Sequence, residues 1–266
     1  MPQYNPKGSR SLELHLKGLK GLKGLKGDKL ASRVAVQGKQ AKPLVYEKEK
    51  SLSEIVIFGA GGHAVSAMNV AVSAGYSVTA YVDDDRVGGN IFGIPIVSQD
   101  YFKEKFRENC VCVAIGDNSV REKIFSDLQK NYENIFFPSL VHASSVIGLG
   151  TTLSEGVVVM PLSNVGPNSS IGKGCIVNSR SNLDHDCEME AFSSLAPGVT
   201  CGGGVTIGSR TALSLSAVVR HDVKIGSDVV IGAGSYVHQN IADNVVAFGT
   251  PCRVQRTRTR GDRYLA

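Results

Sequence analysis

Residues 145–159 read SVIGLGTTLSEGVVV, and an apolar side chain recurs in this stretch at every sixth position, beginning at Ile147. With apolar residues at 42% of the chain, sixteen apolar positions in one chosen phase arise by chance about once in a million. A six-residue period is too short for a helical repeat and predicts a parallel β-helix. The positions are Ile147, Leu153, Val159, Val165, Ile171, Val177, Leu183, Met189, Leu195, Cys201, Ile207, Leu213, Val219, Ile225, Ile231 and Val237.

Each hexapeptide is expected to supply one short strand and one corner, so that three strands complete a coil of about eighteen residues. Side chains alternate along a strand, so the sixth-position residue and the small residue two before it should point inward. Gly follows the sixth position at seven corners, where we expect it to relieve the turn of the backbone. Residues eighteen apart should stack in columns about 4.8 Å apart.

Charge is distributed unevenly along the 266 residues, which leave room for two domains. The net charge is +5, but residues 1–50 hold 12 Lys and Arg against 4 Asp and Glu, and residues 251–266 hold five Arg against one Asp. The remainder carries a net charge of −7. Because the basic residues are confined to the two ends, the composition gives little support to nucleic-acid binding.

Six scattered cysteines show neither a disulfide framework nor zinc-ligand spacing, which fits the reducing cytoplasm. No apolar run approaches the length of a membrane span, and the N-terminus lacks the apolar core of a signal peptide. We therefore expect a cytoplasmic protein with no metal, no membrane insertion and no nucleic-acid partner.

The N-terminal segment contains Leu-Lys-Gly four times in tandem from Leu16 to Gly27. Lys and Gly at this frequency cannot bury a core, so we predict that residues 1–50 form a disordered basic extension. A small βαβ domain is expected at 51–140, a β-helix at 141–253 and a basic tail at 254–266. Residues 51–253 are then the expected active unit.

The small domain shows a strand, a glycine-rich turn and a helix in succession. The turn is Gly59-Ala60-Gly61-Gly62-His63, which lets backbone N–H groups approach a phosphate at a helix N-terminus. About four strands amount to half of a full dinucleotide fold, so a mononucleotide such as the UDP or GDP of a nucleotide sugar fits better than NAD. Strands are expected at 53–58, 78–82 and 111–115, and helices after Gly62, after Ser98 and from a capping box at Ser119 to Tyr132.

Hexapeptide repeats that contain Asp184-His185-Asp186-Cys187 follow this turn. The combination resembles the sugar O-acyltransferases and nucleotide-sugar N-acetyltransferases of the sialic-acid and bacillosamine/perosamine pathways, which are hexapeptide-repeat acetyltransferases. The similarity spans about residues 53–253. It implies a Rossmann-like βαβ domain followed by a left-handed parallel β-helix, a homotrimer, and acetyl-CoA bound as co-substrate between neighbouring β-helices.

The resemblance also implies a site for the nucleotide sugar on the small domain. The diphosphate would face the glycine-rich turn, the nucleoside would meet an acidic pair, and a second loop would line the same pocket. The residues expected to bind this substrate are Ala60, Gly61, Gly62, His63, Asp83, Asp84, Gly116, Asp117 and Asn118.

In the family, the His of a His-acidic pair is the proposed general base, a role that falls here on His185, with Asp186 orienting it. A His with a pKa near 6.5 accepts a proton readily at neutral pH. Many relatives carry a second His in a His-apolar-Ala-Pro-Gly motif, but Ser194 stands at that position here. Ser194 cannot serve as a base, although its hydroxyl can donate a hydrogen bond to the acetyl carbonyl.

Adding eighteen residues, the expected length of one coil, places Gly203 one coil above His185 and His221 one coil further on. Gly203 lacks a side chain, which opens a slot for the thioester and exposes a backbone N–H. We expect His221 to be a solvated polar residue. By resemblance, Leu215 and Ala233 match positions that cradle CoA, and Arg253 keeps a cation for a CoA phosphate. The residues expected to bind acetyl-CoA are Ser194, Gly203, Leu215, Ala233 and Arg253.

The function expected first is acetyl-CoA-dependent N-acetylation of the amino group of a UDP- or GDP-linked amino-deoxy sugar. One alternative is O-acetylation of a sialic acid or related sugar. A zinc carbonic anhydrase of the β-helical type would need three His converging across a subunit interface. A non-catalytic sugar-nucleotide sensor is the fourth reading. The motifs leave open which sugar and which nucleotide are used.

Overall fold

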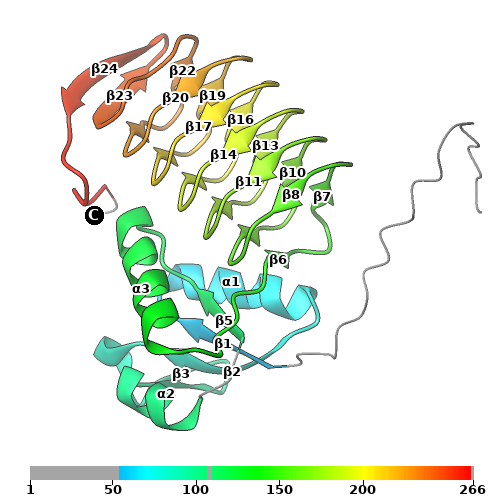
Figure 1. Ribbon diagram of the computed structural model, residues 1–266, viewed down its shortest axis with the longest axis vertical. Coiled ribbons are helices and arrows are strands. Elements are labelled where there is room, and N and C mark those ends of the chain that lie inside the picture. The colour runs from blue at the N-terminus through cyan, green and yellow to red at the C-terminus, as the bar shows by residue number, and fades with distance from the viewer. Residues whose placement is uncertain (1–53, 107–109, 265–266) are drawn as a thin grey trace, which may run out of the picture. The chain divides into compact units, whose positions relative to one another are not determined.

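The computed structural model describes residues 54–106 and 110–264, so the predicted disordered extension 1–50 lies outside the described residues. A mixed sheet with its helices, the N-terminal sheet, precedes a parallel β-helix (Figure 1). The sheet has the strand order β3-β4-β2-β1-β5 and is parallel except for the β3–β4 hairpin. Its elements are β1 Glu54–Phe58, α1 Gly62–Ser73, β2 Ser77–Val82, a 3-10 turn Asp84–Arg86, β3 Asn90–Ile91, β4 Ile94–Val97, α2 Gln99–Lys105, β5 Cys110–Val113 and α3 Asn118–Asn131.

Two local expectations for this sheet need correction. The hairpin β3–β4 was not expected, because a two-residue strand shows no readable alternation of side chains. Helix α3 begins at Asn118 rather than at the Ser119 capping box, since the Asp117 carboxylate accepts hydrogen bonds from the N–H groups of Ser119 and Val120, both at 3.0 Å. Asp is as good an N-cap as Ser and comes two residues earlier. The Ser98 cap of α2 is confirmed by a 3.1 Å bond from the Tyr101 N–H.

The β-helix stacks two-residue strands into three sheets. One face, which we call the cavity face because the cavity described below lies on it, holds β6, β9, β12, β15, β18, β21, β23 and β24. The second face holds β7, β10, β13, β16, β19 and β22. The third face holds β8, β11, β14, β17 and β20. The bounds are β6 Leu140–Val141, β7 Val146–Ile147, β8 Thr152–Leu153, β9 Val158–Val159, β10 Asn164–Val165, β11 Ser170–Ile171, β12 Ile176–Val177, β13 Asn182–Leu183, β14 Glu188–Met189, β15 Ser194–Leu195, β16 Thr200–Cys201, β17 Thr206–Ile207, β18 Ala212–Leu213, β19 Val218–Val219, β20 Lys224–Ile225, β21 Val230–Ile231, β22 Tyr236–Val237, β23 Val245–Gly249 and β24 Cys252–Thr257.

The six-residue period is confirmed. Each of the sixteen predicted apolar positions is the second residue of its strand, from Ile147 in β7 to Val237 in β22. From Val159 onward these residues are buried in one continuous core. The predicted eighteen-residue register also holds, since Leu183 pairs with Cys201 and Cys201 with Val219.

The corners turn at a different residue from the one predicted. Left-handed φ angles fall three residues after every apolar position except the last, Val237, as at Gly204 (φ 70°) and Asp186 (φ 57°). The glycines directly after the apolar positions serve close packing between coils instead. A Cβ on Gly166 would lie 2.5 Å from the backbone carbon of Asp184 in the next coil. Relief of the corner by these glycines was therefore the wrong physical reason for a correct pattern.

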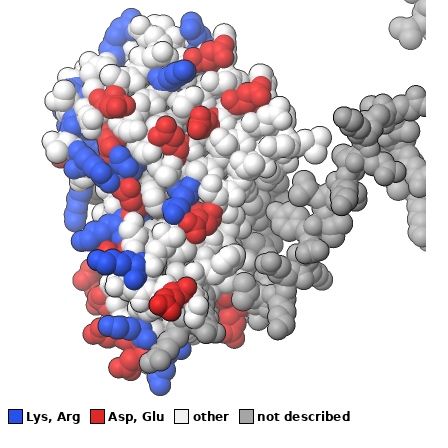
Figure 2. Space-filling view, viewed as in Figure 1, with Lys and Arg blue, Asp and Glu red and all other residues white. Residues whose placement is uncertain are grey.

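Both ends of the β-helix are covered. Strands β23 and β24 form an antiparallel hairpin that pairs onto β21 and closes the last coil, as terminal caps of repeat folds do. At the other end, α1 residues Ala67 and Val70 share a buried cluster with Leu140 and Met160. On the face shown in Figure 2, Lys and Arg are interspersed with Asp and Glu, so no continuous basic field spans it.

Candidate active site

The glycine-rich turn, residues 59–63, and the second predicted loop, residues 116–118, lie at the same edge of the N-terminal sheet. Strands β1 and β5 are parallel neighbours, and their carboxyl ends lead into residues 59–63 and 114–118. Ligands of open α/β sheets bind at this kind of edge, where the crossover direction reverses. The structure therefore brings Gly61, His63 and Gly116 to one edge, as the motif order predicts.

The start of α1 is built to receive an anion. Its N-cap Gly61 supplies no side-chain cap, and no acidic residue lies in its first turn. A Cβ built on Gly61 or Gly62 meets no atom within 4 Å. These glycines therefore leave open space at the positive end of the helix, beside the N–H groups of Gly62 and His63, which have no hydrogen-bond partner among the described residues.

The acidic pair is already bonded to backbone groups. Asp83 accepts a 2.9 Å hydrogen bond from the Ala60 N–H, and Arg86 donates a 2.8 Å bond to the Ala60 carbonyl. Asp84 holds the Gln99 N–H at 2.9 Å and the Gln99 amide at 2.8 Å. Asp83 therefore shapes the glycine-rich turn, and its contact with a nucleoside stays a prediction.

A buried cation fixes the second loop. Arg121 is 1% exposed and donates to the carbonyl of Gly116 at 3.1 Å and to the Asn118 side chain at 2.7 Å. It also donates across to the β-helix, to Gly174 at 2.7 Å and Phe192 at 2.8 Å. Burial lowers the pKa of Arg121. No sequence pattern indicates this role, because Arg121 lies in what reads as the exposed start of a helix.

Some residues predicted to bind the nucleotide sugar and some predicted to bind acetyl-CoA line one cavity of about 440 Å³. Its lining includes His63 and Gly116 from the N-terminal sheet and Ser194 and Leu215 from the β-helix. The His63 Nε2 atom is buried and has no hydrogen-bond partner among the described residues. Burial, with the nearby Arg121 charge, lowers the pKa of His63 to about 4, so its imidazole is neutral near pH 7. Asn178 and Tyr264 also line the cavity and were not predicted.

The predicted base has the expected carboxylate beside it. His185 Nδ1 lies 2.7 Å from the Asp186 Oδ2 atom, and both side chains are more than half exposed. This hydrogen bond, with the charge of Asp184, raises the pKa of His185. The same bond, with one to Asn168, lowers the pKa of Asp186. Because Nδ1 is occupied, Nε2 is the nitrogen left to accept a proton from a substrate.

Gly203 lies directly against the imidazole, as the column register predicts. A Cβ built on Gly203 would stand 2.6 Å from the Cε1 atom of His185 and 2.7 Å from its Nε2 atom. The Gly204 N–H donates to the His185 carbonyl at 2.9 Å, whereas the Gly203 N–H has no bond among the described residues. Such an N–H is suited to a carbonyl oxygen that gains negative charge.

We expect Gly203→Val to raise the KM for acetyl-CoA and to lower kcat without unfolding the protein. The new side chain meets the end of an exposed imidazole rather than backbone, so the ring moves and the fold stays. Steady-state kinetics and a thermal melt measure the two effects. Gly202→Val is the matched contrast, because its Cβ would lie 2.8 Å from the His221 backbone nitrogen and should destabilise the coil. An unchanged KM for acetyl-CoA in folded Gly203→Val would refute this placement.

The remaining predicted CoA contacts lie further along the β-helix. Ala233 sits one coil beyond Leu215, and the Gly234 N–H bonds the Leu215 carbonyl at 2.8 Å. Both side chains are exposed. Arg253 lies in β24 and bonds the Cys252 carbonyl at 3.0 Å. Their contact with CoA stays a prediction.

His185 and the cavity lie on different sides of the same chain. His185 is at the corner between β13 and β14, where the second face meets the third. The cavity is lined from β12, β15 and β18 of the cavity face. In a three-sided coil this corner is opposite the cavity face, so one chain does not bring its own His185 to its own cavity.

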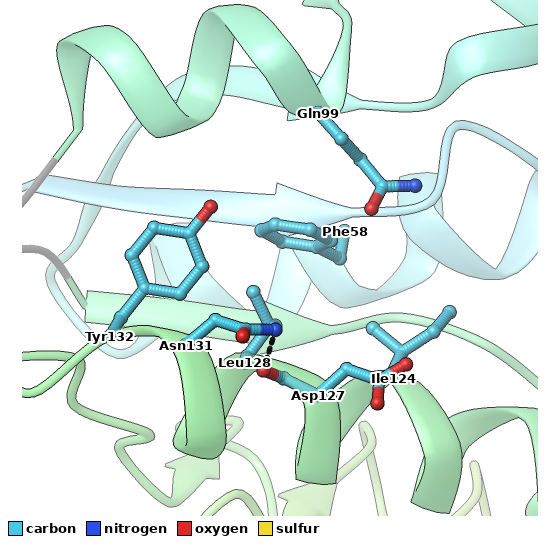
Figure 3. Close-up of a pocket in the computed structure, with 7 residues that line it drawn as sticks. All are labelled: Phe58, Gln99, Ile124, Asp127, Leu128, Asn131 and Tyr132. Carbon is cyan, nitrogen blue, oxygen red and sulfur yellow. Dashed lines mark hydrogen bonds between the residues drawn. The ribbon is translucent and has the colours of Figure 1, made fainter.

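A second, smaller hollow lies between α2 and α3 over the end of β1 (Figure 3). Phe58, Gln99 and Tyr132 surround it, and none of the predicted site residues does. Its volume of about 90 Å³ is far smaller than the 440 Å³ of the cavity that His63 and Ser194 line.

Known proteins resemble both the N-terminal sheet and the β-helix of this chain. The family model described as the PglD N-terminal domain matches residues 54–128. PerB from Caulobacter crescentus, solved in complex with CoA and GDP-perosamine, is 33% identical with a TM-score of 0.72, covering 76% of this chain and 97% of PerB. The chain belongs to the nucleotide-sugar acetyltransferases of the hexapeptide-repeat class. The family expected from the motifs is thus confirmed.

Two curated relatives of this acetyltransferase differ in the bond they make. GDP-perosamine N-acetyltransferase of Escherichia coli O157:H7 is 27% identical over 187 residues, which are 67% of this chain and 82% of the relative. Galactoside O-acetyltransferase of Lactococcus lactis is 52% identical over 167 residues, which are 58% of this chain and 73% of the relative. Because the chain belongs to a family of acetyltransferases, the hypotheses of a carbonic anhydrase and of a non-catalytic sensor are rejected.

Within residues 54–106 and 110–264, no group of three or more His, Cys, Asp or Glu is arranged to hold a metal ion. Over the same described part of the acetyltransferase, no helix has the length and apolarity to cross a membrane.

Proposed function

We propose that this acetyltransferase moves the acetyl group of acetyl-CoA to the amino group of a GDP- or UDP-linked amino-deoxy sugar. The observation that carries the proposal is the cavity that His63 and Gly116 share with Ser194 and Leu215. It joins residues expected to bind the nucleotide sugar to residues expected to bind acetyl-CoA. The CoA and GDP-perosamine bound to PerB support the same pair of substrates.

The chemistry needs one proton acceptor. The sugar amine attacks the thioester carbon, forming a C–N bond while the C–S bond breaks. The nitrogen gives its proton to the neutral imidazole of His185, and the departing sulfur of CoA takes a proton in turn. Asp186 supports the imidazolium that forms, since it bonds Nδ1 at 2.7 Å. The Gly203 N–H faces the carbonyl oxygen, on which negative charge grows.

We also propose that a neighbouring copy supplies this base. Since the corner that holds His185 is opposite the cavity face of the same chain, the corner of a second β-helix must reach the cavity of the first. A homotrimer with cyclic symmetry repeats that contact three times. The site is then a property of the assembly.

A thiol-release assay tests the proposed function. Wild-type protein and acetyl-CoA are incubated with GDP- and UDP-linked amino sugars, with the corresponding hydroxyl sugars, and with free galactosides. We expect free thiol with an amino sugar nucleotide and little with the others. O-acetylation is the second candidate, favoured by the similarity to galactoside O-acetyltransferase, and thiol release with galactosides alone would establish it instead.

Loss of the Asp83 carboxylate should weaken binding of the nucleotide sugar. Asp83→Ala frees the Ala60 N–H, which Asp83 holds at 2.9 Å, and loosens the glycine-rich turn. We expect the KM for the nucleotide sugar to rise about tenfold, the effect of one lost hydrogen bond to a charged group, with the KM for acetyl-CoA unchanged. Asp85→Ala, in the same acidic run, is the control. Equal changes in both KM values would show general damage to the protein.

A further inference from the structure

The chain beyond β24 is anchored back onto the site. Arg258 is 7% exposed and donates to the Asp228 carbonyl at 3.3 Å and to the carbonyl of Asp262. Its guanidinium lies over the ring of Tyr264, 5.7 Å from the centroid. Residues 258–264, expected to be part of a basic tail, therefore form a held segment, which we call the C-terminal strap.

Two further contacts fix the course of the strap. The Thr259 N–H donates to the Asp262 carboxylate at 2.9 Å, and the Asp262 N–H to the Thr259 carbonyl at 3.0 Å, which closes a turn. Arg260 pairs with Glu122 on α3 at 2.9 Å. The strap is thus tied both to the β-helix and to the helix that follows the second loop.

The strap delivers one aromatic hydroxyl to the cavity. The Tyr264 hydroxyl donates to the Gly116 carbonyl at 3.2 Å and accepts from the Asn118 N–H at 3.3 Å. Burial raises the pKa of Tyr264, an effect that the nearby Arg121 charge and the Ser194 side chain partly offset. Tyr264 lines the cavity beside His63.

The bonds of this hydroxyl leave it free to exchange partners. Its 3.2 Å bond to the Gly116 carbonyl is longer than the usual range of about 2.5–3.0 Å for a hydroxyl donor, and the 3.3 Å bond from the Asn118 N–H is longer than the usual range of about 2.7–3.2 Å for an N–H donor. A ligand oxygen or nitrogen at normal distance therefore competes well. A phenol has one donor hydrogen and two acceptor lone pairs. In a cavity whose lining is largely aliphatic, from Leu195, Ala196, Pro197 and Leu213, such a group selects a ligand with polar substituents at that point.

We propose that Tyr264 is a specificity-determining residue that binds the sugar of the nucleotide-sugar substrate through its hydroxyl. The inference rests on the proposed function for the class of substrate. It adds the C-terminal strap to the substrate site, so that residues 51–253, the unit expected from the sequence, lack a substrate-binding group.

Calorimetric titration of the full-length protein tests this. Wild type, Tyr264→Phe and the control Tyr101→Phe, an exposed tyrosine of α2, are titrated with GDP-perosamine, with a UDP-linked amino sugar, and with GDP and UDP alone. We expect Tyr264→Phe to bind the preferred sugar nucleotide about tenfold more weakly, the effect of one lost hydrogen bond in a buried site. The nucleoside diphosphate alone should bind as to wild type.

The outcomes separate the proposals. Equal weakening for the sugar nucleotide and the nucleoside diphosphate would show that Tyr264 merely supports the second loop, which overturns the inference. Unchanged binding of both would also overturn it. Wild type that binds a sugar nucleotide but releases no thiol removes the proposed function, while selective weakening in Tyr264→Phe still supports the role of Tyr264. Wild type that binds no sugar nucleotide removes both.

Discussion

Replacing His185 with Asn lowers kcat about 10²–10⁴-fold, the usual contribution of a positioned general base, while the KM values of both substrates change little. Asn keeps the size of the side chain and removes the nitrogen that accepts the proton. The imidazole is more than half exposed, so its loss should not alter stability. Steady-state kinetics with a thermal melt of each variant separate the two effects.

The pH dependence of kcat provides a second test of the assignment of His185 as the general base. His185 acts as a base in its neutral form, and its bond to Asp186 raises its pKa above the ordinary histidine value. The kcat of wild type should therefore rise with pH through an apparent pKa above that value. Asp186→Asn removes the main cause of the shift, so the rising limb should move to lower pH while kcat at its plateau falls less than in His185→Asn.

His221→Asn is the matched control, because His221 stands in the same column two coils beyond His185. It should retain its activity. If His185→Asn keeps more than about a tenth of wild-type kcat, it loses less than a general base contributes and the base lies elsewhere. The neutral imidazole of His63, whose Nε2 atom has no hydrogen-bond partner in the described part of the chain, would then be the next candidate.

Two inactive variants should restore activity when they assemble together. Gly61→Asp places a carboxylate at the N-cap of α1, where Asp stabilises a helix but occupies its N–H groups and repels a diphosphate. His185→Asn lacks the base. If each site takes its base from one copy and its cavity from the next, one site in each purified mixed trimer is intact, so these assemblies should recover about a third of wild-type activity.

The control for this experiment pairs His185→Asn with Gly203→Val. Both changes lie at the same corner of the β-helix, so mixing them should restore nothing. Co-expression with two affinity tags and sequential purification isolates the mixed assemblies. Mixed assemblies of the first pair that stay inactive would place the whole site within one chain.

The β-helix was readable from the sequence because its information is local and repeated. An uninterrupted six-residue spacing fixes the register, so the neighbours of His185 and Gly203 follow by adding eighteen. The same logic located the glycine-rich turn at the end of β1. These features need nothing beyond the pattern of residues along a short segment.

The contacts that join distant segments were not readable. Arg121 bonds Gly174 and Phe192, which lie 53 and 71 residues away, and Tyr264 bonds Gly116 at a separation of 148 residues. No period or spacing connects them, since each pair meets only after the N-terminal sheet packs on the β-helix. The role of the glycines that follow the apolar positions was predicted wrongly for another reason. The sequence pattern alone does not distinguish a glycine that is needed for a left-handed φ from one that is needed for close packing between coils.

The identity of the product tests the proposed N-acetylation of a nucleotide sugar most directly. Wild-type protein is incubated with ¹³C-acetyl-CoA and the amino sugar nucleotide that releases most thiol, and the purified product is examined by NMR and mass spectrometry. We expect one labelled acetyl group joined through an amide to the sugar nitrogen of an intact nucleotide sugar. An ester on a sugar hydroxyl, or no labelled sugar nucleotide at all, would contradict it.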